Sequence, residues 1–571
     1  MTTPHRSLQS EIARRLEDAP DQPALTFFDP GGGWRWLSFA ELHRRASRCA
    51  RHLQDRGLRS GEVCVLVLPS DQHACDAVLG VLLAGGVPVS VAPPVVRGLH
   101  SNLAEVVRHV VRTTAARAVL IGEEGWSLGT DLAARRPDLA VIKAPDAWAH
   151  AAPDATIPAL PAGDAVAALQ LTSGTTGFPR VCVWDQKAVL AALDGMEAAM
   201  GLTADDVCVN WTPLYHDMGL VNNFLLCLVK RVPLVMLETM AFLKRPSSWL
   251  RALFETRATT TWSPNFGFAL MTRRVSDREL EGINLAGVKG FWNAAERIHL
   301  ETMRAFHERF ARFGVSMAAL KTNFGCAENV GGATFSDPKG TFVVEHVDRE
   351  ALYHQGLARP PADDRSNDAV SVVGVGRPYP GIRIEILSDR GRPLADGRIG
   401  RIALATPSRM RGYLNNATET RRAIRGDFVL TGDLGYKRGE ELFWVGRARE
   451  RINLQGKKYD PSDFEKAVFG VAGLREGCFA AFGVDDARLG TQKLVIVAER
   501  RQDNGRPDDE LVNDVKEEVA RHVGVTVHDV VLLEQGTMTK TSSGKRRHRH
   551  YRQLYADGAL APARCALSSP A

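Results

Sequence analysis

The sequence lacks the features of an exported or membrane-embedded protein. Its first sixteen residues, MTTPHRSLQSEIARRL, are polar and charged and contain no apolar signal-peptide core. One long apolar run, residues 77–96, is interrupted by Gly85, Gly86, Pro88, Pro93 and Pro94, which a membrane-spanning helix tolerates poorly. A buried helix, turn and strand explains this run better. We therefore expect no membrane span and a cytoplasmic location.

Paired cysteines and a marked excess of one charge are also missing. The nine cysteines are scattered, and no two have the spacing of a zinc knuckle or a redox pair. We interpret them as reduced thiols, mostly in the core. The formal net charge is +6, from 72 basic and 66 acidic residues. So small an excess, spread over a large surface, does not indicate a nucleic-acid-binding protein.

The pattern along the chain predicts an α/β protein of more than one domain. A chain of 571 residues with 44% hydrophobic residues exceeds the size of one ordinary core. Helical and strand patterns alternate over residues 11–91, 165–240 and 259–328, which predicts a mostly parallel sheet with helices on both faces. Between residues 340 and 371 the pattern fades into a charged stretch that we interpret as a surface insertion or loop. Short alternating strands over residues 372–443 predict an antiparallel subdomain.

A polar loop with two glycines lies between two predicted strands. Residues 171–180 read LTSGTTGFPR, after the apolar strand 165–171 and before the strand 181–184. The glycines permit close approach of the backbone, and the four hydroxyl side chains can donate to phosphate oxygens. The Walker A pattern is absent. The loop therefore predicts an anion cradle of another kind, although a polar hairpin turn would fit the same residues if they stood alone.

Five further motifs follow this loop in the order and approximate spacing of one superfamily. They are WTPLYHDMG (211–219), NFGCAE (323–328), TGD (431–433), GR (446–447) and KTSSGK (540–545). The set resembles the adenylate-forming superfamily of acyl- and aryl-CoA ligases, luciferases and nonribosomal adenylation domains, over nearly the whole chain.

Within that superfamily the fatty acyl-AMP ligases are the most similar group. The strings that carry this resemblance are PLYHDMGL (213–220), AFLKRP (241–246), SPNF (263–266) and NAAE (293–296). The extra segment around residues 340–368 also resembles an insertion that such ligases carry.

The resemblance implies the domain arrangement. A large N-terminal domain of layered mixed sheets with helices would cover residues 1–448, with the insertion near 340–370 and a distorted antiparallel, barrel-like subdomain. A small, mobile α+β domain would cover residues 449–571 and carry the catalytic lysine. Glu450 stands at the hinge position, where the family usually has Asp or Lys.

The chemistry of the family needs ATP and Mg²⁺, since a carboxylate must attack the α-phosphate while negative charge accumulates. By resemblance, Lys545 stabilises the transition state, Glu328 holds Mg²⁺ and His216 lines the carboxylate pocket. We expect the acid itself to contact parts of 215–223, 266–271 and Phe291. The nucleotide-binding residues implied are Thr172, Ser173, Gly174, Thr175, Thr176, Gly177, Arg180, Asn293, Ala294, Ala295, Asn323, Phe324, Gly325, Asp433 and Arg447.

We predict an ATP-dependent acyl-AMP ligase that activates a fatty or related carboxylic acid and releases pyrophosphate. The acyl group would then pass to the phosphopantetheine thiol of an acyl carrier protein. A CoA ligase is the first alternative. Asp217, next to His216, leaves an amino-acid adenylation enzyme of a nonribosomal peptide pathway as the second. A catalytically silent module that binds nucleotide is the third.

Overall fold

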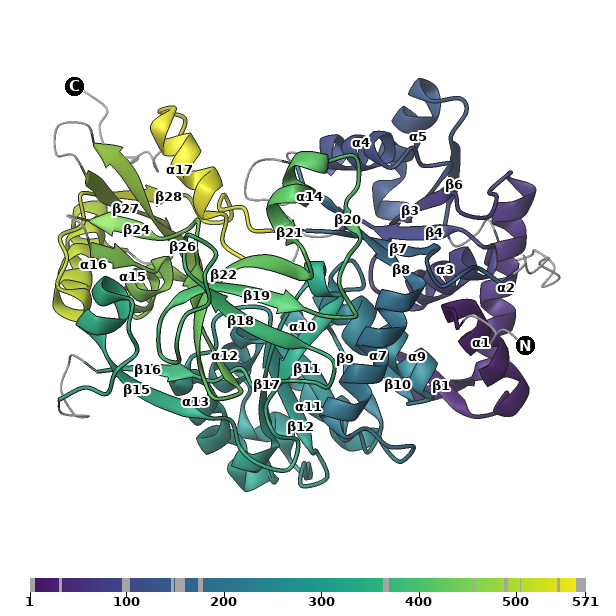
Figure 1. Cartoon of the computed structure of the whole chain (residues 1–571), viewed down its shortest axis with the longest axis horizontal. Helices are drawn as coiled ribbons and strands as arrows, with labels where there is room; N and C mark the ends of the chain where they lie inside the picture. Colours follow the sequence, from purple (N-terminus) through teal and green to yellow (C-terminus); the bar gives the residue numbers. More distant parts are fainter. Residues whose placement is uncertain are drawn as a thin grey trace.

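Two large mixed sheets form the body of the molecule (Figure 1). The computed structural model describes residues 6–29, 33–94, 103–144, 148, 160–172, 178–362, 369–454, 457–486, 491–503, 505–541 and 545–560. No helix in these ranges combines the length and apolarity needed to cross a lipid bilayer.

The larger sheet has nine strands in the order β17-β14-β13-β12-β11-β9-β10-β1-β2. Its central strands, from β13 to β1, run parallel, and β2, β14 and β17 pair antiparallel at the two edges. The bounds are β1 Pro23–Asp29, β2 Gly33–Ser38, β9 Cys208–Asn210, β10 Leu234–Met236, β11 Thr260–Pro264, β12 Gly290–Ala294, β13 Leu320–Cys326, β14 Gly331–Phe335 and β17 Arg377–Pro378.

The second sheet has seven strands in the order β20-β8-β7-β4-β3-β5-β6. Strands β3 to β7 are parallel, while β8 and β20 are antiparallel to their neighbours. The bounds are β3 Val63–Val67, β4 Val87–Ser90, β5 Ala118–Ile121, β6 Ala140–Lys143, β7 Val166–Leu171, β8 Val181–Asp185 and β20 Gly412–Tyr413.

Helices cover both faces of the second sheet, as the sequence predicted. In β3, Cys64 and Leu66 point into the core shared with the larger sheet, while Val65 and Val67 pack with α4 and α5 on the opposite face. A strand buried on both faces has to be apolar at every position. The α-helices described between residues 8 and 310, which alternate with the strands of the two large sheets, are α1 Leu8–Asp18, α2 Phe39–Asp55, α3 Gln72–Leu83, α4 Leu103–Thr113, α5 Trp126–Arg135, α7 Gln186–Met200, α8 Asp217–Gly219, α9 Leu226–Lys230, α10 Thr239–Lys244, α11 Ser247–Glu255, α12 Asn265–Arg274 and α13 Leu300–Phe310.

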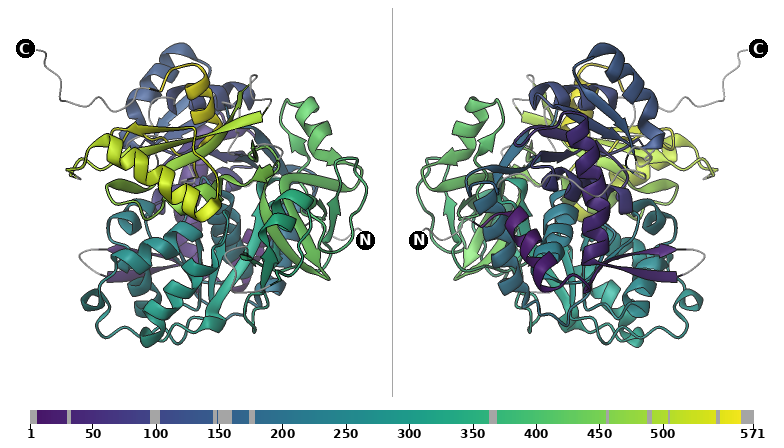
Figure 2. Two further views of the ribbon diagram at one scale, coloured as in Figure 1. Left: turned by 90° about the vertical axis from the view of Figure 1, so that its left-hand side faces the viewer. Right: turned by 90° about the vertical axis from the view of Figure 1, so that its right-hand side faces the viewer.

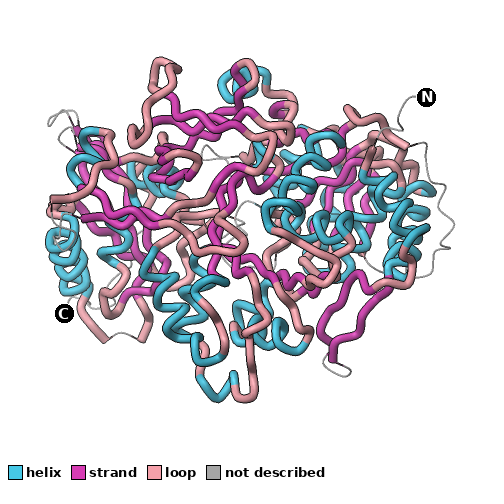
Figure 3. Tube along the Cα trace, turned by 60° about the horizontal axis from the view of Figure 1, so that its bottom comes forward, coloured by secondary structure: helices cyan, strands magenta, loops and turns pink. Residues whose placement is uncertain are grey.

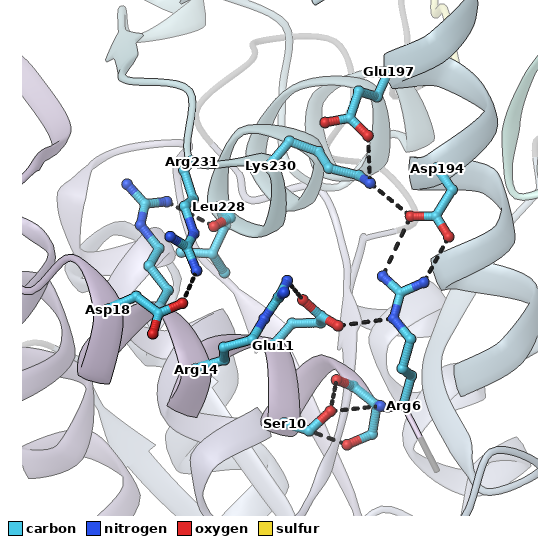
Figure 4. Close-up of polar contacts among 12 residues, drawn as sticks. Arg6, Ser10, Glu11, Arg14, Asp18, Asp194, Glu197, Leu228, Lys230 and Arg231 are labelled. Atoms are coloured by element: carbon cyan, nitrogen blue, oxygen red, sulfur yellow. Dashed lines mark hydrogen bonds and ion pairs between the residues drawn. The ribbon is translucent and has the colours of Figure 1, made fainter. Parts of the chain in front are cut away.

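Helix α1 is held against α7 and α9 (Figure 4). Arg6 bridges Glu11 and Asp194, at 2.8 and 2.7 Å, and Lys230 also reaches Asp194 at 2.6 Å. Surface ion pairs of this kind contribute little to stability. Arg15 is the stronger anchor, because its buried guanidinium donates to the carbonyls of Cys227 and Leu228 in α9.

An antiparallel sheet follows the larger sheet in the chain. Its strands are β18 Arg383–Leu387, β19 Gly400–Ala405, β21 Ile424–Arg425, β22 Phe428–Arg438 and β23 Glu441–Arg447, with α14 Ala417–Ala423 between β20 and β21. This agrees with the antiparallel subdomain that the turn-rich sequence predicted.

The segment that we interpreted as a surface insertion or loop has regular structure. Strand β15 (Val344–Asp348) pairs antiparallel with β16 (Ala369–Val373), and the helical turn η8 (Ala351–Gln355) follows β15. Tyr353 is buried in a small core with Tyr436 and Phe443. The interpretation as an insertion or loop missed these elements because the charged residues of the stretch hide the few apolar anchors; residues 363–368, within the charged stretch itself, lie outside the described residues.

The C-terminal part has its own cores and lies at one end of the molecule, far from α1 (Figures 1 and 2). Its three-stranded sheet has the order β26-β27-β28, and a two-stranded ribbon, β24-β25, precedes it. As in the rest of the molecule, helices flank the strands (Figure 3). The elements are β24 Ile452–Leu454, β25 Lys457–Tyr459, α15 Pro461–Val468, β26 Leu474–Asp486, β27 Thr491–Arg500, α16 Asp508–Val523, β28 Asp529–Leu533 and α17 His548–Ala556.

Candidate active site

A cavity of about 940 Å³ lies where parallel strands of both sheets end and the C-terminal part approaches them. Strands β7, β12 and β13 all reach it with their carboxyl ends, which is where α/β sheets commonly bind ligands. The residues predicted for the site that line it are Thr172, Arg180, His216, Ala294, Ala295, Asn323, Phe324, Gly325, Glu328, Asp433, Arg447, Glu450 and Lys545. Motifs up to 373 residues apart in the chain, from Thr172 to Lys545, thus meet in one place.

Thr172 and Arg180, at the two ends of the polar loop between β7 and β8, line this cavity. The central residues of the loop, Ser173, Gly174, Thr175, Thr176 and Gly177, lie outside the described residues. The hydroxyl of Thr172, just before them, is buried and has no hydrogen-bond partner among the atoms that the structure describes. Such a group needs a partner, and a ligand oxygen in the cavity would supply one.

Lys545 reaches the cavity from the C-terminal part. Its backbone N–H donates to the Thr541 hydroxyl at 2.9 Å. Burial and the neighbouring Arg447 lower the pKa of its ammonium, while Asp217 and other carboxylates act in the opposite direction. Phosphate oxygens of a ligand in the cavity would raise the pKa of the Lys545 ammonium and so favour its charged form.

His216 and Asp217 form a close pair at the start of α8. The ring Nδ1 of His216 lies 2.8 Å from the Asp217 carboxylate. Burial alone would raise the pKa of Asp217, but His216 and Lys545 hold it below its usual value. Asp217 therefore stays ionised and partners the cations around it.

Glu328 is a buried carboxylate with one oxygen already engaged. The Tyr413 hydroxyl donates to Oε1 at 2.6 Å, and Arg180, which lies 4.2 Å above the Tyr413 ring, approaches the same oxygen at 3.8 Å. Within the described part of the chain, no hydrogen bond is found to Oε2, and Glu328 is one of the residues that line the cavity. A single free carboxylate oxygen fits Mg²⁺, which takes one or two carboxylates and completes its shell with phosphate oxygens and water.

Asp433 and Arg447 also line the cavity. They pair across β22 and β23, where the Arg447 Nε lies 3.3 Å from the Asp433 carboxylate. Asp433 raises the pKa of the Arg447 guanidinium, which therefore stays charged. A buried carboxylate of this kind can accept hydrogen bonds from vicinal hydroxyls of a ribose.

Two residues expected at the site face away from the cavity. The Asn293 side chain is buried and donates to Asn265 at 3.2 Å. Phe291, expected in the acid pocket, was a wrong prediction, because it packs edge-on against Trp249 and Phe306 in the core. Both lie on β12, where residues two apart share a face, and that face packs on α13.

Sequence reasoning assigned no role to several polar residues of the site. Glu296 accepts a hydrogen bond from the Phe266 N–H at 2.6 Å, and burial raises the pKa of its carboxyl. Arg297 donates to Ser462 at 2.7 Å and to Asp463 at 3.1 Å, across to α15. Only Glu296 had a signal in the sequence, as the last residue of the NAAE string.

Glu450 lies at the junction between the two parts. Its carboxylate is 3.6 Å from His548 Nδ1, and the other ring nitrogen of His548 lies 2.6 Å from Glu465. Burial lowers the pKa of His548, but these two carboxylates raise it by more, so the pKa lies above its usual value. A cluster of charges thus surrounds the predicted hinge.

Known proteins resemble the chain over almost its full length. The sequence profile of the family described as AMP-binding enzyme matches residues 12–414. The long-chain-fatty-acid–AMP ligase FadD26 of Mycobacterium marinum is 28% identical, over 96% of this chain and 97% of its own. The medium-chain-fatty-acid–acyl-carrier-protein ligase JamA of Moorena producens is 27% identical, over 92% and 90%. A solved structure from a study of fatty acyl-adenylate ligases of E. coli and L. pneumophila superposes with a TM-score of 0.89 at 26% identity, covering 97% of this chain and 98% of that one.

Proposed function

This chain belongs to the AMP-binding enzyme family, and on that premise we propose that its cavity joins a fatty or related carboxylic acid to AMP. The chain is an AMP-forming carboxylate ligase of the acyl-AMP ligase type. One observation carries the assignment to this cavity: Lys545, Glu328 and Asp433 line the same space from three separate parts of the chain.

The reaction couples two anions, and the residues present suit that task. A carboxylate oxygen of the acid bonds to the α-phosphorus of ATP, and the bond from this phosphorus to the bridging oxygen breaks, so that pyrophosphate leaves. Lys545 neutralises the charge that accumulates on the α-phosphate. Asp433 holds the ribose hydroxyls, and the hydroxyl of Thr172 donates to the triphosphate. Mg²⁺, held by Glu328, would offset the charge of the phosphates.

We propose that the second half-reaction uses the phosphopantetheine thiol of an acyl carrier protein. The name of the relative JamA, an acyl-carrier-protein ligase, supports this acceptor. The C-terminal part, residues 449–571, would turn about Glu450 between the two half-reactions, and its separate cores support its treatment as one body. We place the enzyme in the cytoplasm, where ATP and carrier proteins are available.

ATP–pyrophosphate exchange across panels of fatty acids and amino acids tests the first half-reaction. We expect exchange with acids and an acyl-adenylate of the matching mass. Dependence on amino acids would instead make the enzyme an amino-acid adenylation enzyme, and the absence of exchange with every acid would favour a silent module.

Incubation with ATP, the best acid and either CoA or a phosphopantetheinylated carrier protein tests the acceptor. We expect the carrier thioester to form faster than acyl-CoA. Efficient formation of acyl-CoA would overturn the proposed acceptor while leaving the adenylation step in place.

A further inference from the structure

A histidine three residues after Lys545 lies between two carboxylates of different segments. His548 begins α17 and lines the cavity. Its Nε2 lies 2.6 Å from Glu465 of α15, and its Nδ1 lies 3.6 Å from Glu450 at the predicted hinge. This Nδ1 is buried and makes no hydrogen bond within the described residues. A shift of less than about 1 Å would bring the Glu450 carboxylate into hydrogen-bond distance of it.

The link from His548 to Glu465 lies wholly within the C-terminal part. Glu465 is 5% exposed and also pairs with Arg546 at 3.2 Å. Helix α17 belongs to the same body, because its Tyr551 is buried in one core with Phe482 of β26. His548 is therefore fixed to the C-terminal part, and its link to Glu465 would survive a turn of that part.

The link from His548 to Glu450 spans the junction between the two parts. The Glu450 N–H donates to the Arg447 carbonyl at 3.2 Å, and the Ala448 N–H donates to the carbonyl of Gly432 on β22 at 3.1 Å. The backbone that leads into the C-terminal part is thus bonded to the antiparallel sheet. Because the Glu450 side chain reaches His548 from this segment, a turn of the C-terminal part about it would separate the two groups.

Charge and burial favour the pair between His548 and Glu450 in the present arrangement. Burial opposes the charge on His548, but Glu465 and Glu450 favour it and keep its pKa above the usual value. The side chains of His548 and Glu450 are only 14% and 20% exposed. Salt and water therefore screen their attraction less than that of a surface pair.

We infer that His548 is a positioning residue that keeps Lys545 in the cavity during adenylation, by joining Glu450 at the hinge to the C-terminal part. The inference rests on the proposed function, because it concerns the turn of residues 449–571 between the half-reactions. Without the pair, the arrangement with Lys545 in the cavity is populated less, and adenylation slows in proportion. Transfer to the thiol uses the other arrangement and does not slow.

The test measures the two half-reactions of the full-length enzyme separately. His548→Gln keeps a donor for Glu465 and removes the charge that faces Glu450. We expect the kcat of pyrophosphate exchange to fall about 10-fold, while single-turnover transfer from a supplied acyl-adenylate to the carrier thiol is unchanged or faster. His522→Gln is the matched control, because the His522 ring of α16 lies 3.1 Å from Glu518 and does not line the cavity. It should change neither half-reaction.

A double-mutant cycle identifies the partner of His548. Glu450→Gln should slow pyrophosphate exchange by a similar factor. The double variant should be no slower than either single variant, because each change removes the same pair. Effects that multiply in the cycle would overturn the inference, and so would a fall of both half-reactions by the same factor in His548→Gln, which would indicate a general loss of structure.

The outcomes also separate the inference from the function on which it rests. If the wild type forms adenylates and His548→Gln exchanges pyrophosphate equally fast, the inference fails while the ligase assignment stands. If the wild type forms adenylates but transfers nothing to the carrier, the proposed acceptor fails, and the cycle in pyrophosphate exchange alone decides the inference. If the wild type forms no adenylate from any acid, the proposed function fails and the inference fails with it.

Discussion

Tyr413→Phe isolates the group that positions the proposed magnesium ligand. The change removes the hydroxyl that donates to Glu328 at 2.6 Å. It keeps the aromatic ring beneath Arg180, whose guanidinium carbon lies 4.2 Å from the ring centroid. Packing and the cation–π contact are therefore preserved, and only the orientation of the Glu328 carboxylate is released.

The size of the effect follows from the burial of both partners. Tyr413 and Glu328 are 6% and 8% exposed, so water competes little for their hydrogen bond. A hydrogen bond to a charged group contributes about 1.5–3 kcal/mol, which corresponds to roughly 10- to 100-fold in an equilibrium constant. Loss of a residue that orients a metal ligand costs about the same factor in metal affinity.

The assay is pyrophosphate exchange at fixed ATP and increasing free Mg²⁺. We expect the Mg²⁺ concentration for half-maximal rate to rise about 10- to 100-fold, with a maximal rate close to that of the wild type. Tyr379→Phe is the control, because its buried hydroxyl bonds Ser408 at 2.8 Å outside the cavity. An unchanged Mg²⁺ dependence in Tyr413→Phe, or the same change in the control, would refute the assigned role of Glu328.

Three further predictions follow from the site. Lys545→Ala should slow pyrophosphate exchange about 10²- to 10³-fold, yet still transfer the acyl group from a supplied acyl-adenylate to the carrier thiol. Asp433→Ala should raise the KM for ATP about 10-fold or more, since hydrogen bonds to a charged group are lost; an unchanged KM would place the ribose elsewhere. Burial lowers the pKa of His299 to about 3, so below pH 6.5 the unfolded chain takes up a proton that the folded chain does not, and stability falls as pH falls towards 3. His299→Gln should remove up to about 1.4 kcal/mol per pH unit of that slope in urea unfolding measured between pH 4 and 7.

The sheets were predictable because burial on both faces leaves a clear pattern. The run Val63–Val67 is apolar at every position, and the structure shows why, since both faces of β3 are covered. The segment around Tyr353 gave no such signal. Its burial depends on Tyr436 and Phe443, which lie more than 80 residues further along the chain.

Residues of the site were likewise predictable where their signal is a continuous motif, and not where their role depends on a residue far away in the sequence. The strings around His216 and Glu328 were visible because each motif is continuous in the sequence. Tyr413 was not, because its role comes from a carboxylate 85 residues away. The prediction that Phe291 contacts the acid was wrong for a local reason. The order of residues in β12 did not reveal which face of the strand packs on α13.

The contacts between the C-terminal part and the rest of the molecule are mainly polar, and this bears on how the two half-reactions alternate. Arg297 reaches Asp463, Lys466 pairs with Glu301 at 2.8 Å, and Arg273 pairs with Glu476. The apolar cores on the two sides remain separate. The Lys466–Glu301 and Arg273–Glu476 pairs are largely exposed and can be exchanged for water at little cost. The Arg297–Asp463 pair is mostly buried, so its separation also requires that both groups regain water, whereas a shared apolar core would have to be exposed. The polar junction therefore supports the proposal that residues 449–571 turn away after adenylation, taking Lys545 out of the cavity and clearing the approach for a thiol.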